Sequence, residues 1–352
     1  MIKIPTGYHI AQFSKNGKLL SICGYLGRVR VLDIKTGKTL YNMTVKGIGT
    51  GTATILHQDF SFDEQYFAFS CNRKVYVFLC RETGKFTQEE LKIQGLEVKE
   101  KSVHFFKLHK IIDVSHLERC YTINMLFHPS LPILIIPQGK DLHFLDLHKD
   151  TLFVLPTPEK KDYTKHFTMS NDGKYLAYQA MENKIYIYEV AKNIEKSQLI
   201  NTLEISYQYF AGRSMDENIF SFIENTEKLA VFRKSEGFSI YNFLTGKEEQ
   251  IIPFTQIGYR SIFNFASSKI SSDGKYLFFK SENPNSQNID EWSISDKDLE
   301  WILYNVENQE IVWKQQGSFP QGDIDFENKK IAILQNTWAG RKIESFVELH
   351  PL

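Results

Sequence analysis

The chain lacks most of the features that assign a function from sequence. Its 352 residues include only four cysteines, Cys23, Cys71, Cys80 and Cys120, and no two of them have the C-x-x-C spacing of a metal or redox pair. Lys and Arg (42) balance Asp and Glu (42), so the basic excess that nucleic-acid and anionic-membrane binders need is missing. We therefore expect structural thiols, and a partner that is neither nucleic acid nor membrane.

Long apolar runs and targeting signals are also missing. No stretch reaches the length of a membrane span, and the start, MIKIPTGYHI, has no apolar region followed by a small-residue cleavage site. These observations predict a cytoplasmic protein. The composition, 42% hydrophobic and 14% aromatic with no linker, predicts a single globular domain over residues 1–352 and a monomer.

Catalytic and ligand motifs are absent or incomplete. The glycine-rich segment 46–52 lacks the Gly-Lys-Ser/Thr ending of a phosphate loop, and no G-x-S-x-G nucleophile turn occurs. Six histidines fall in one third of the chain without forming an H-E-x-x-H pair, and segment 296–300 lacks the glycine of a calcium loop. We expect no catalytic, cofactor or metal site, and hence a protein that is not an enzyme.

What the chain does have is a repeated phrase: a short strand, a tight turn, an aromatic-rich strand and a further strand that runs into a second turn. Clear copies begin at Phe13, Phe167 and Ile270, and fainter ones lie between them at intervals of roughly 40 to 70 residues. Runs such as KIYIYEV are rich in β-branched and aromatic residues, and Asp-Gly or Thr-Gly pairs supply the turns. Repeats of this length with several strands each predict propeller blades.

We count seven copies, and the sequence therefore predicts an all-β, seven-bladed propeller of four-stranded antiparallel blades. The last copy lacks a fourth strand, and the segment Met1 to Pro5 is expected to supply it and close the ring. The predicted blades cover residues 13–45, 57–93, 122–156, 166–205, 219–254, 268–316, and 323–350 plus 1–5.

The blade phrase resembles the WD40-like propeller superfamily over essentially the whole chain. The resemblance rests on SNDGKYLAYQ followed by KIYIYEV, and on the D-x-x-T-G-K ending from Asp33 to Lys38. No copy ends in Trp-Asp, which indicates a divergent, bacterial member. The superfamily implies a rigid interaction platform, although propellers also host unrelated functions.

Elaborations fall on one side of the predicted propeller. Turns between the first and second and the third and fourth strands of each copy are short, whereas the other two connections vary in length. The largest are Gln94 to Arg119, expected as an added hairpin or short helix over the ring, and Ser281 to Leu299. Because binding loops sit on the elaborated edge of a rigid scaffold, we expect this face to bind a partner.

Trp, Tyr and Arg residues in these connections are the candidate contacts, since such residues dominate interface energetics. Packing of the same side chains onto the rim is the competing interpretation, favoured for Tyr259. Trp301 and Trp313 fall within predicted strands and are interpreted as structural. The candidate partner-binding residues are Trp292, Trp338, Arg341, Arg213, Arg260 and Tyr259.

These features predict a non-catalytic protein-binding module, either a dedicated neutralising protein of the immunity or antitoxin type or a general scaffold. The alternative is a small-molecule-binding protein, or a lyase- or lactonase-like enzyme that uses the central channel. Such a channel would be lined by first-strand residues, which the repeat register places at Gln12, Asp59, Asn124, Thr168, Ser221, Lys269 and Asp325.

Overall fold

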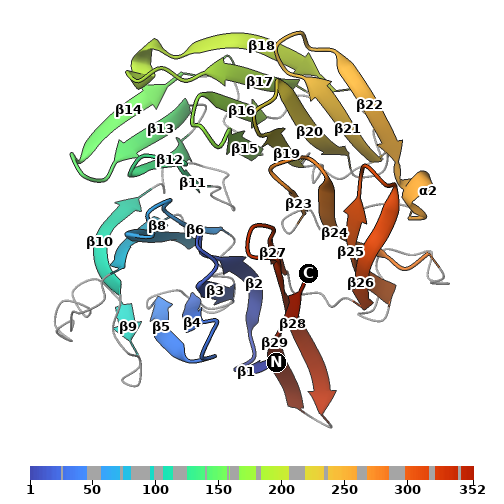
Figure 1. Cartoon of the computed structure of the whole chain (residues 1–352). Coiled ribbons are helices and arrows are strands. Elements are labelled where there is room, and N and C mark those ends of the chain that lie inside the picture. The colour runs from blue at the N-terminus through green and yellow to red at the C-terminus, as the bar shows by residue number, and fades with distance from the viewer. Residues whose placement is uncertain are drawn as a thin grey trace, which may run out of the picture. The chain divides into compact units, whose positions relative to one another are not determined.

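The computed structural model describes most of the chain as β-strands. The described residues are 1–24, 27–45, 57–71, 74–80, 96–98, 106–113, 125–138, 141–156, 158, 166–179, 184–205, 219–233, 237–259, 268–284, 298–316, 322–339 and 342–352. They form seven antiparallel sheets, each built from strands that succeed one another along the chain except where noted below. This is the strand topology of a seven-bladed β-propeller, as the repeat predicts. Figure 1 shows the sheets in sequence colour.

We number the sheets as blades 1 to 7. Residues Met1–Leu152 and Pro320–Leu352 make one compact unit, unit 1, and Phe153–Phe319 make a second, unit 2. The interpretation of residues 1–352 as a single domain stays a prediction.

Unit 1 holds blade 7 and blades 1 to 3, whose last strand runs into unit 2. Blade 1 is β2 (Tyr8–Phe13), β3 (Leu19–Gly24), β4 (Arg28–Asp33) and β5 (Thr39–Val45); blade 2 is β6 (Gln58–Phe60), β7 (Tyr66–Cys71), β8 (Lys74–Cys80) and β10 (Phe106–Asp113); blade 3 is β11 (Leu126–Phe127), β12 (Ile133–Gln138), β13 (Asp141–Asp146) and β14 (Thr151–Leu155); blade 7 is β27 (Asp323–Asp325), β28 (Lys330–Ala339), β29 (Lys342–Pro351) and β1 (Ile2–Ile4).

Unit 2 holds blades 4 to 6. Blade 4 is β15 (His166–Met169), β16 (Tyr175–Gln179), β17 (Lys184–Glu189) and β18 (Gln198–Glu204), with a 3-10 turn η1 (Ile194–Lys196); blade 5 is β19 (Ile219–Ile223), β20 (Lys228–Arg233), β21 (Gly237–Asn242) and β22 (Glu248–Pro253), followed by helix α2 (Phe254–Ile257); blade 6 is β23 (Lys269–Ile270), β24 (Tyr276–Glu282), β25 (Leu299–Asn305) and β26 (Glu310–Gln316).

The N-terminal strand completes the last blade. β1 pairs antiparallel with β29, with Ile2 opposite Val347 and Ile4 opposite Ser345. Figure 1 shows β1 beside the C-terminal strands. The predicted closure of blade 7 by the first residues of the chain is therefore confirmed, and it covers a sheet edge that would otherwise be open.

In its described residues, 96–98 and 106–113, the segment Gln94 to Arg119 does not form the expected added hairpin or short helix over the ring. β9 (Leu96–Val98) pairs with β5 and adds a fifth strand to the sheet of blade 1. β10 pairs with β8 along its whole length and is the fourth strand of blade 2. The interpretation as an added hairpin or helix fails because free strand edges take up an extended apolar segment more readily than a blade face does.

Middle strands are largely buried, and within each unit the apolar side chains of neighbouring blades pack against one another. All six residues of β7 are buried, whereas most of β26 is exposed. One apolar core joins blades 1, 2 and 3 through Tyr41, Phe78 and Leu134. Others join blades 7 and 1, blades 4 and 5, and blades 5 and 6. At about 1.5–3 kcal/mol per large buried side chain, this packing is the main stabilising contribution.

In blades 1, 2, 4 and 6, the turn between the first and second strands is closed by a serine. In blade 4, Ser170 Oγ donates to Asp172 Oδ1 (2.6 Å) and accepts from the Tyr175 amide (2.8 Å). Gly173 follows with a φ of 72° that L side chains rarely adopt. Ser14, Ser61 and Ser271 make the same pair of hydrogen bonds in blades 1, 2 and 6.

Turns between the third and fourth strands use an acceptor side chain at the end of the third strand. Asp33 accepts from the amide and the hydroxyl of Thr36, and Gly37 follows with a φ of 66°. Asp146, Asn242 and Asn305 accept two backbone amides each in blades 3, 5 and 6. Both sets of turns therefore satisfy their own polar groups within a few residues.

Replacing Gly17 by Ala is expected to destabilise the protein more than replacing Gly258 by Ala. Both glycines have positive φ (65° and 88°), so both substitutions carry a backbone cost of about 1 kcal/mol. A Cβ at Gly17 would lie 2.1 Å from Asp325 Oδ2, whereas nothing lies within 4 Å of one at Gly258. Urea unfolding should show Gly17→Ala losing about 2–3 kcal/mol in total. Equal losses in the two variants would contradict the contact between the turns of blades 1 and 7.

Candidate functional site

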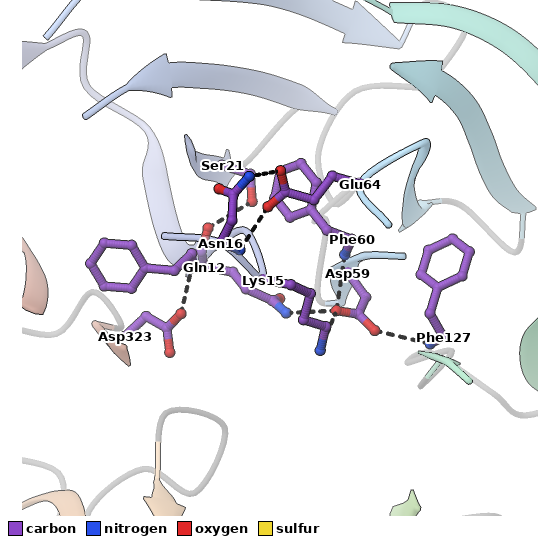
Figure 2. A network of polar contacts seen from close by, with 10 residues as sticks. Gln12, Lys15, Asn16, Ser21, Asp59, Phe60, Glu64, Phe127 and Asp323 are labelled. Atoms are coloured by element: carbon purple, nitrogen blue, oxygen red, sulfur yellow. Dashed lines mark hydrogen bonds and ion pairs between the residues drawn. The ribbon is translucent and has the colours of Figure 1, made fainter. Parts of the chain in front are cut away.

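Polar side chains on the first strands of unit 1 form a continuous network (Figure 2). Asp59 in β6 is at its centre and is 3% exposed. Its Oδ1 accepts from Gln12 Nε2 in blade 1 (3.0 Å) and from the Phe60 amide (2.9 Å). Its Oδ2 accepts from the Phe127 amide in blade 3 (2.9 Å). A single carboxylate thereby links three successive blades.

Asp323 repeats this role one blade earlier. It lies in β27, is 1% exposed, and accepts from the Phe13 amide of blade 1 through Oδ2 (2.7 Å). The sequence register placed Asp325 at this position, and that placement is wrong by two residues. Asp325 instead pairs with Lys330 and accepts from the Asn328 amide in the turn. The error arose because β27 is short and the blade 7 turn lacks the serine that marks the register in blades 1, 2, 4 and 6.

Two more contacts reinforce the junction between blades 1 and 2. The Cys23 thiol donates to Gln58 Oε1 (2.6 Å), and burial raises the pKa of that thiol well above its usual value. At the turn, the Asn16 amide donates to Glu64 Oε1 (2.8 Å). Cys23 and Cys71 are buried and Cys80 is half-buried, all as free thiols. Cys120 lies outside the described residues.

The only cation near this network is, among the described residues, Lys15. Its ammonium lies 3.8 Å from Asp59 Oδ1, and its side chain is about half exposed. The Asp59 carboxylate itself receives donors from the chain on both oxygens. The Asp59 carboxylate is therefore a fixed hydrogen-bond acceptor that holds neighbouring blades in register. Buried charge-assisted hydrogen bonds stabilise other folded proteins in the same way.

Unit 2 has a comparable link between blades 4 and 5. The His166 ring in β15 meets the Phe220 ring of β19 edge-on at 4.7 Å and hydrogen-bonds the Phe220 backbone. Burial lowers the pKa of His166 to about 4, so the imidazole is neutral at pH 7. Sequence reasoning missed this residue, because the repeat register gives the first-strand position to Thr168.

Of the six candidate partner-binding residues, the structure describes the side chain of Tyr259 alone. It follows α2, is 4% exposed, and packs edge-on against Phe279 at 6.3 Å. Its hydroxyl donates to Glu300 Oε2 (2.6 Å), and burial is the main reason that its pKa is raised. This environment agrees with the packing interpretation of Tyr259.

The other candidates have no described side chain. Trp338 lies in β28 with its backbone opposite Ile343. Trp292, Arg341, Arg213 and Arg260 lie outside the described residues, so the structure brings none of the six together. Trp301 is fully buried in β25 and stacks on Phe278 at 4.9 Å. Trp313 lies in β26, and both tryptophans therefore fall within strands as expected.

The described part of the chain offers no group of three or more His, Cys, Asp or Glu residues placed to hold a metal ion. It also contains no helix long and apolar enough to cross a membrane.

The chain matches no protein-family model, and no curated protein is significantly similar to it. Its class is therefore assigned from its strand topology, which is that of the β-propellers.

Replacing Asp59 by Ala is expected to lower the free energy of unfolding by about 2–4 kcal/mol. The reason is that three donors lose their acceptor: Gln12 Nε2 of blade 1, the Phe60 amide of blade 2 and the Phe127 amide of blade 3. The matched control is Asp150→Asn, which removes the charge from an exposed ion pair with Lys110, keeps a residue type that tolerates the φ of 54° at this position, and should leave the free energy of unfolding nearly unchanged. Urea denaturation measures both. A cost for Asp59→Ala no larger than that of the control would show that the network does not hold the blades.

Stability is expected to fall as the pH drops from about 6.5 to about 4, in part through His166. Its folded pKa of about 4 lies below the ordinary value, so in this window the unfolded chain binds a proton that the folded chain excludes. The predicted contribution is up to about 3 kcal/mol. His166→Gln keeps an N–H donor without titrating, and should lose less stability on acidification in thermal melts. Identical pH profiles for the two proteins would refute the assignment.

Proposed function

We propose that this propeller is a non-catalytic module that binds a partner protein through the edge carrying the second-to-third-strand connections and the connections between blades. The observation that carries the proposal is the contrast between the two sets of connections. First-to-second turns, and the third-to-fourth turns of blades 1, 3, 5 and 6, are short, and they satisfy polar groups internally, as Ser170 and Asp33 illustrate; in blade 2, residues 81–105 separate β8 from β10. Such closed turns leave few groups to recognise a partner.

Most connections between blades, and the second-to-third connection of blade 6, are longer and carry three of the candidate contacts, whereas the other second-to-third connections are short. Residues 206–218 follow β18, 260–267 precede β23, and 285–297 lie between β24 and β25. These segments contain Arg213, Arg260 and Trp292, while Trp338 and Arg341 occur at the turn from β28 to β29. Aromatic and arginine side chains on a rigid support are typical of interface hot spots.

The blade-to-blade links support binding over catalysis. Asp59 and Asp323, the buried acids on the first strands of unit 1, accept backbone amides of neighbouring blades. A carboxylate engaged in this way is poorly suited to general acid–base chemistry. The same links hold the blades rigid, so that a partner would dock with little ordering cost in the scaffold.

A more specific form of the proposal is that the protein neutralises one dedicated partner, as an immunity or antitoxin protein does. Two features motivate it: the one-sided elaboration, and the absence of any complete catalytic motif from the sequence. General scaffolding fits the same features equally well. The number of partners distinguishes the two forms, because a neutralising protein has one stoichiometric partner and a scaffold has several.

The test is affinity capture of the tagged protein from its native cell extract, with mass spectrometry of the proteins retained. The triple variant Trp292→Ala, Trp338→Ala and Arg341→Ala is expected to weaken capture of the specific partner by roughly thirtyfold or more, since hot-spot losses are about 2 kcal/mol or larger. The control variant, Leu131→Ala with Lys35→Ala, changes exposed residues in turns of the opposite type and should bind normally.

Both variants must keep the wild-type melting temperature. Unchanged capture by the folded triple variant would contradict the placement of the binding edge. Recovery of the wild-type protein without any partner would contradict the proposal itself and favour a small molecule in the channel.

A further inference from the structure

The first-to-second-strand turn of blade 5 has an apolar residue where the other six have a polar one. In blade 5, the pairing of Phe222 with Leu229 matches that of Met169 with Leu176 in blade 4, which places Ile223 where blades 1, 2, 4 and 6 have the closing serine, blade 3 has His128 and blade 7 has Asp325. No hydroxyl is available there to close the turn. Thr226 acts instead, donating through Oγ1 to the Ile223 carbonyl (2.8 Å) and accepting from the Lys228 amide (3.1 Å).

The altered turn is fastened to blade 6. The Glu224 amide donates to the Ser272 carbonyl (2.6 Å). The Ile223 side chain fills the space above Gly274, where a Cβ would lie 2.8 Å from its Cδ1. A groove opens on each side of the turn, with a volume of about 540 Å³ toward blade 4 and about 430 Å³ toward blade 6. We call the larger groove, which lies between this turn and blade 4, the blade 4–5 groove. The hydrogen bond from the Glu224 amide is on the other side of the turn, toward blade 6.

The bottom of the blade 4–5 groove is aromatic. Tyr175, Phe222 and Phe243 line it, with ring centroids 4.9 Å apart for Tyr175 and Phe243 and 5.2 Å for Phe222 and Phe243. Phe222 and Phe243 are buried and Tyr175 is half-buried. Aromatic faces attract cations as well as apolar groups.

The rim of the groove is acidic. Asp172, Glu224 and Glu227 line it, against the single cation Lys174. Glu227 is exposed and Glu224 is half-buried. Among the described residues no three acidic groups are placed to share a metal ion, so these carboxylates are spread along the groove and not gathered on a point. Such an arrangement complements an extended ligand that carries positive charge.

Lys174, which lines the groove, already places a cation beside the Tyr175 ring. Its ammonium lies 4.9 Å from the centroid of the Tyr175 ring and 3.7 Å from Glu189. Its pKa is raised, with the hydrogen bond to Tyr175 as the leading cause. A basic ligand entering the groove would compete with this ammonium for the same ring.

We propose that the blade 4–5 groove is a docking site for an extended segment of a partner protein in which Lys or Arg alternates with apolar residues. The cation of the segment lies among Glu224, Glu227 and the Tyr175 face, and its apolar neighbours lie along the half-buried Tyr175 side chain, which the buried Phe222 and Phe243 rings support from beneath. This site is on the opposite set of turns from the proposed partner edge and does not rest on that proposal.

The test uses two peptides, acetyl-Leu-Arg-Leu-Lys-Leu-amide and its acidic counterpart with Glu at both charged positions. Binding to the full chain is followed by the ¹³C-methyl signal of Ile223, which lines both grooves, with the buried Ile333 methyl of blade 7 as the internal control. At millimolar concentration the basic peptide should shift the Ile223 signal in a saturable way and leave Ile333 unchanged. The affinity should fall as salt is added.

Three variants make the result specific. Neutralising the rim with Glu224→Gln and Glu227→Gln should weaken binding roughly fivefold to tenfold. Lys174→Ala removes the competing ammonium and should strengthen binding about twofold to fivefold, an effect that mere loss of structure would not produce. Glu204→Gln, an exposed carboxylate on β18, should change nothing.

The proposal is overturned if the Ile223 methyl does not respond to the basic peptide, or responds equally to the acidic one. It is also overturned if the Glu224 and Glu227 double variant, with its melting temperature intact, binds as tightly as the wild type.

Discussion

Burial of both faces of the middle strands is the constraint on which the rest of this structure depends. A strand such as β7 is apolar on both faces and cannot be stable in an isolated sheet. It needs a neighbouring blade on each side, which is why the apolar cores lie between blades and not within them. The links from Asp59, Asp323 and His166 act at the first strands, which except for β2 are shorter than the second strands with which they pair. Packing supplies most of the stability there and elsewhere, and these polar links set the register between blades.

Most of the fold could be predicted from sequence because the blade turns have a strong chemical signature. Ser170, Asp172 and Gly173 fix the register of blade 4 through hydrogen bonds that span only five residues. Closure by β1 was predictable for a different reason, since six blades with four strands left the seventh one strand short. Prediction failed where pairing depends on distant residues: nothing near β9 or β10 indicates that they pair with β5 and β8.

The polar links were only partly predictable. Gln12 and Asp59 lie in first strands as the repeat register predicted, whereas Asp323 was missed by two positions and His166 entirely. Whether such a residue faces a channel or a neighbouring blade depends on the stagger between blades, which the sequence of one blade does not contain. The candidate partner contacts Trp292, Trp338 and Arg341 could be named only by residue type. The sequence does contain one sign of the blade 4–5 groove, which is Ile223 in place of serine. Its meaning became clear only from the structure, in which the Glu224 amide donates to the Ser272 carbonyl of blade 6.

The pairing of β1 with β29 makes unit 1 discontinuous in sequence, with unit 2 inserted as one uninterrupted stretch. During synthesis from the N-terminus, all three blades of unit 2 leave the ribosome before β27 to β29 exist. β1 must therefore wait, unpaired, until β29 has been made. Its short length and its charged Lys3 limit the chance that this exposed segment pairs with another chain in the meantime.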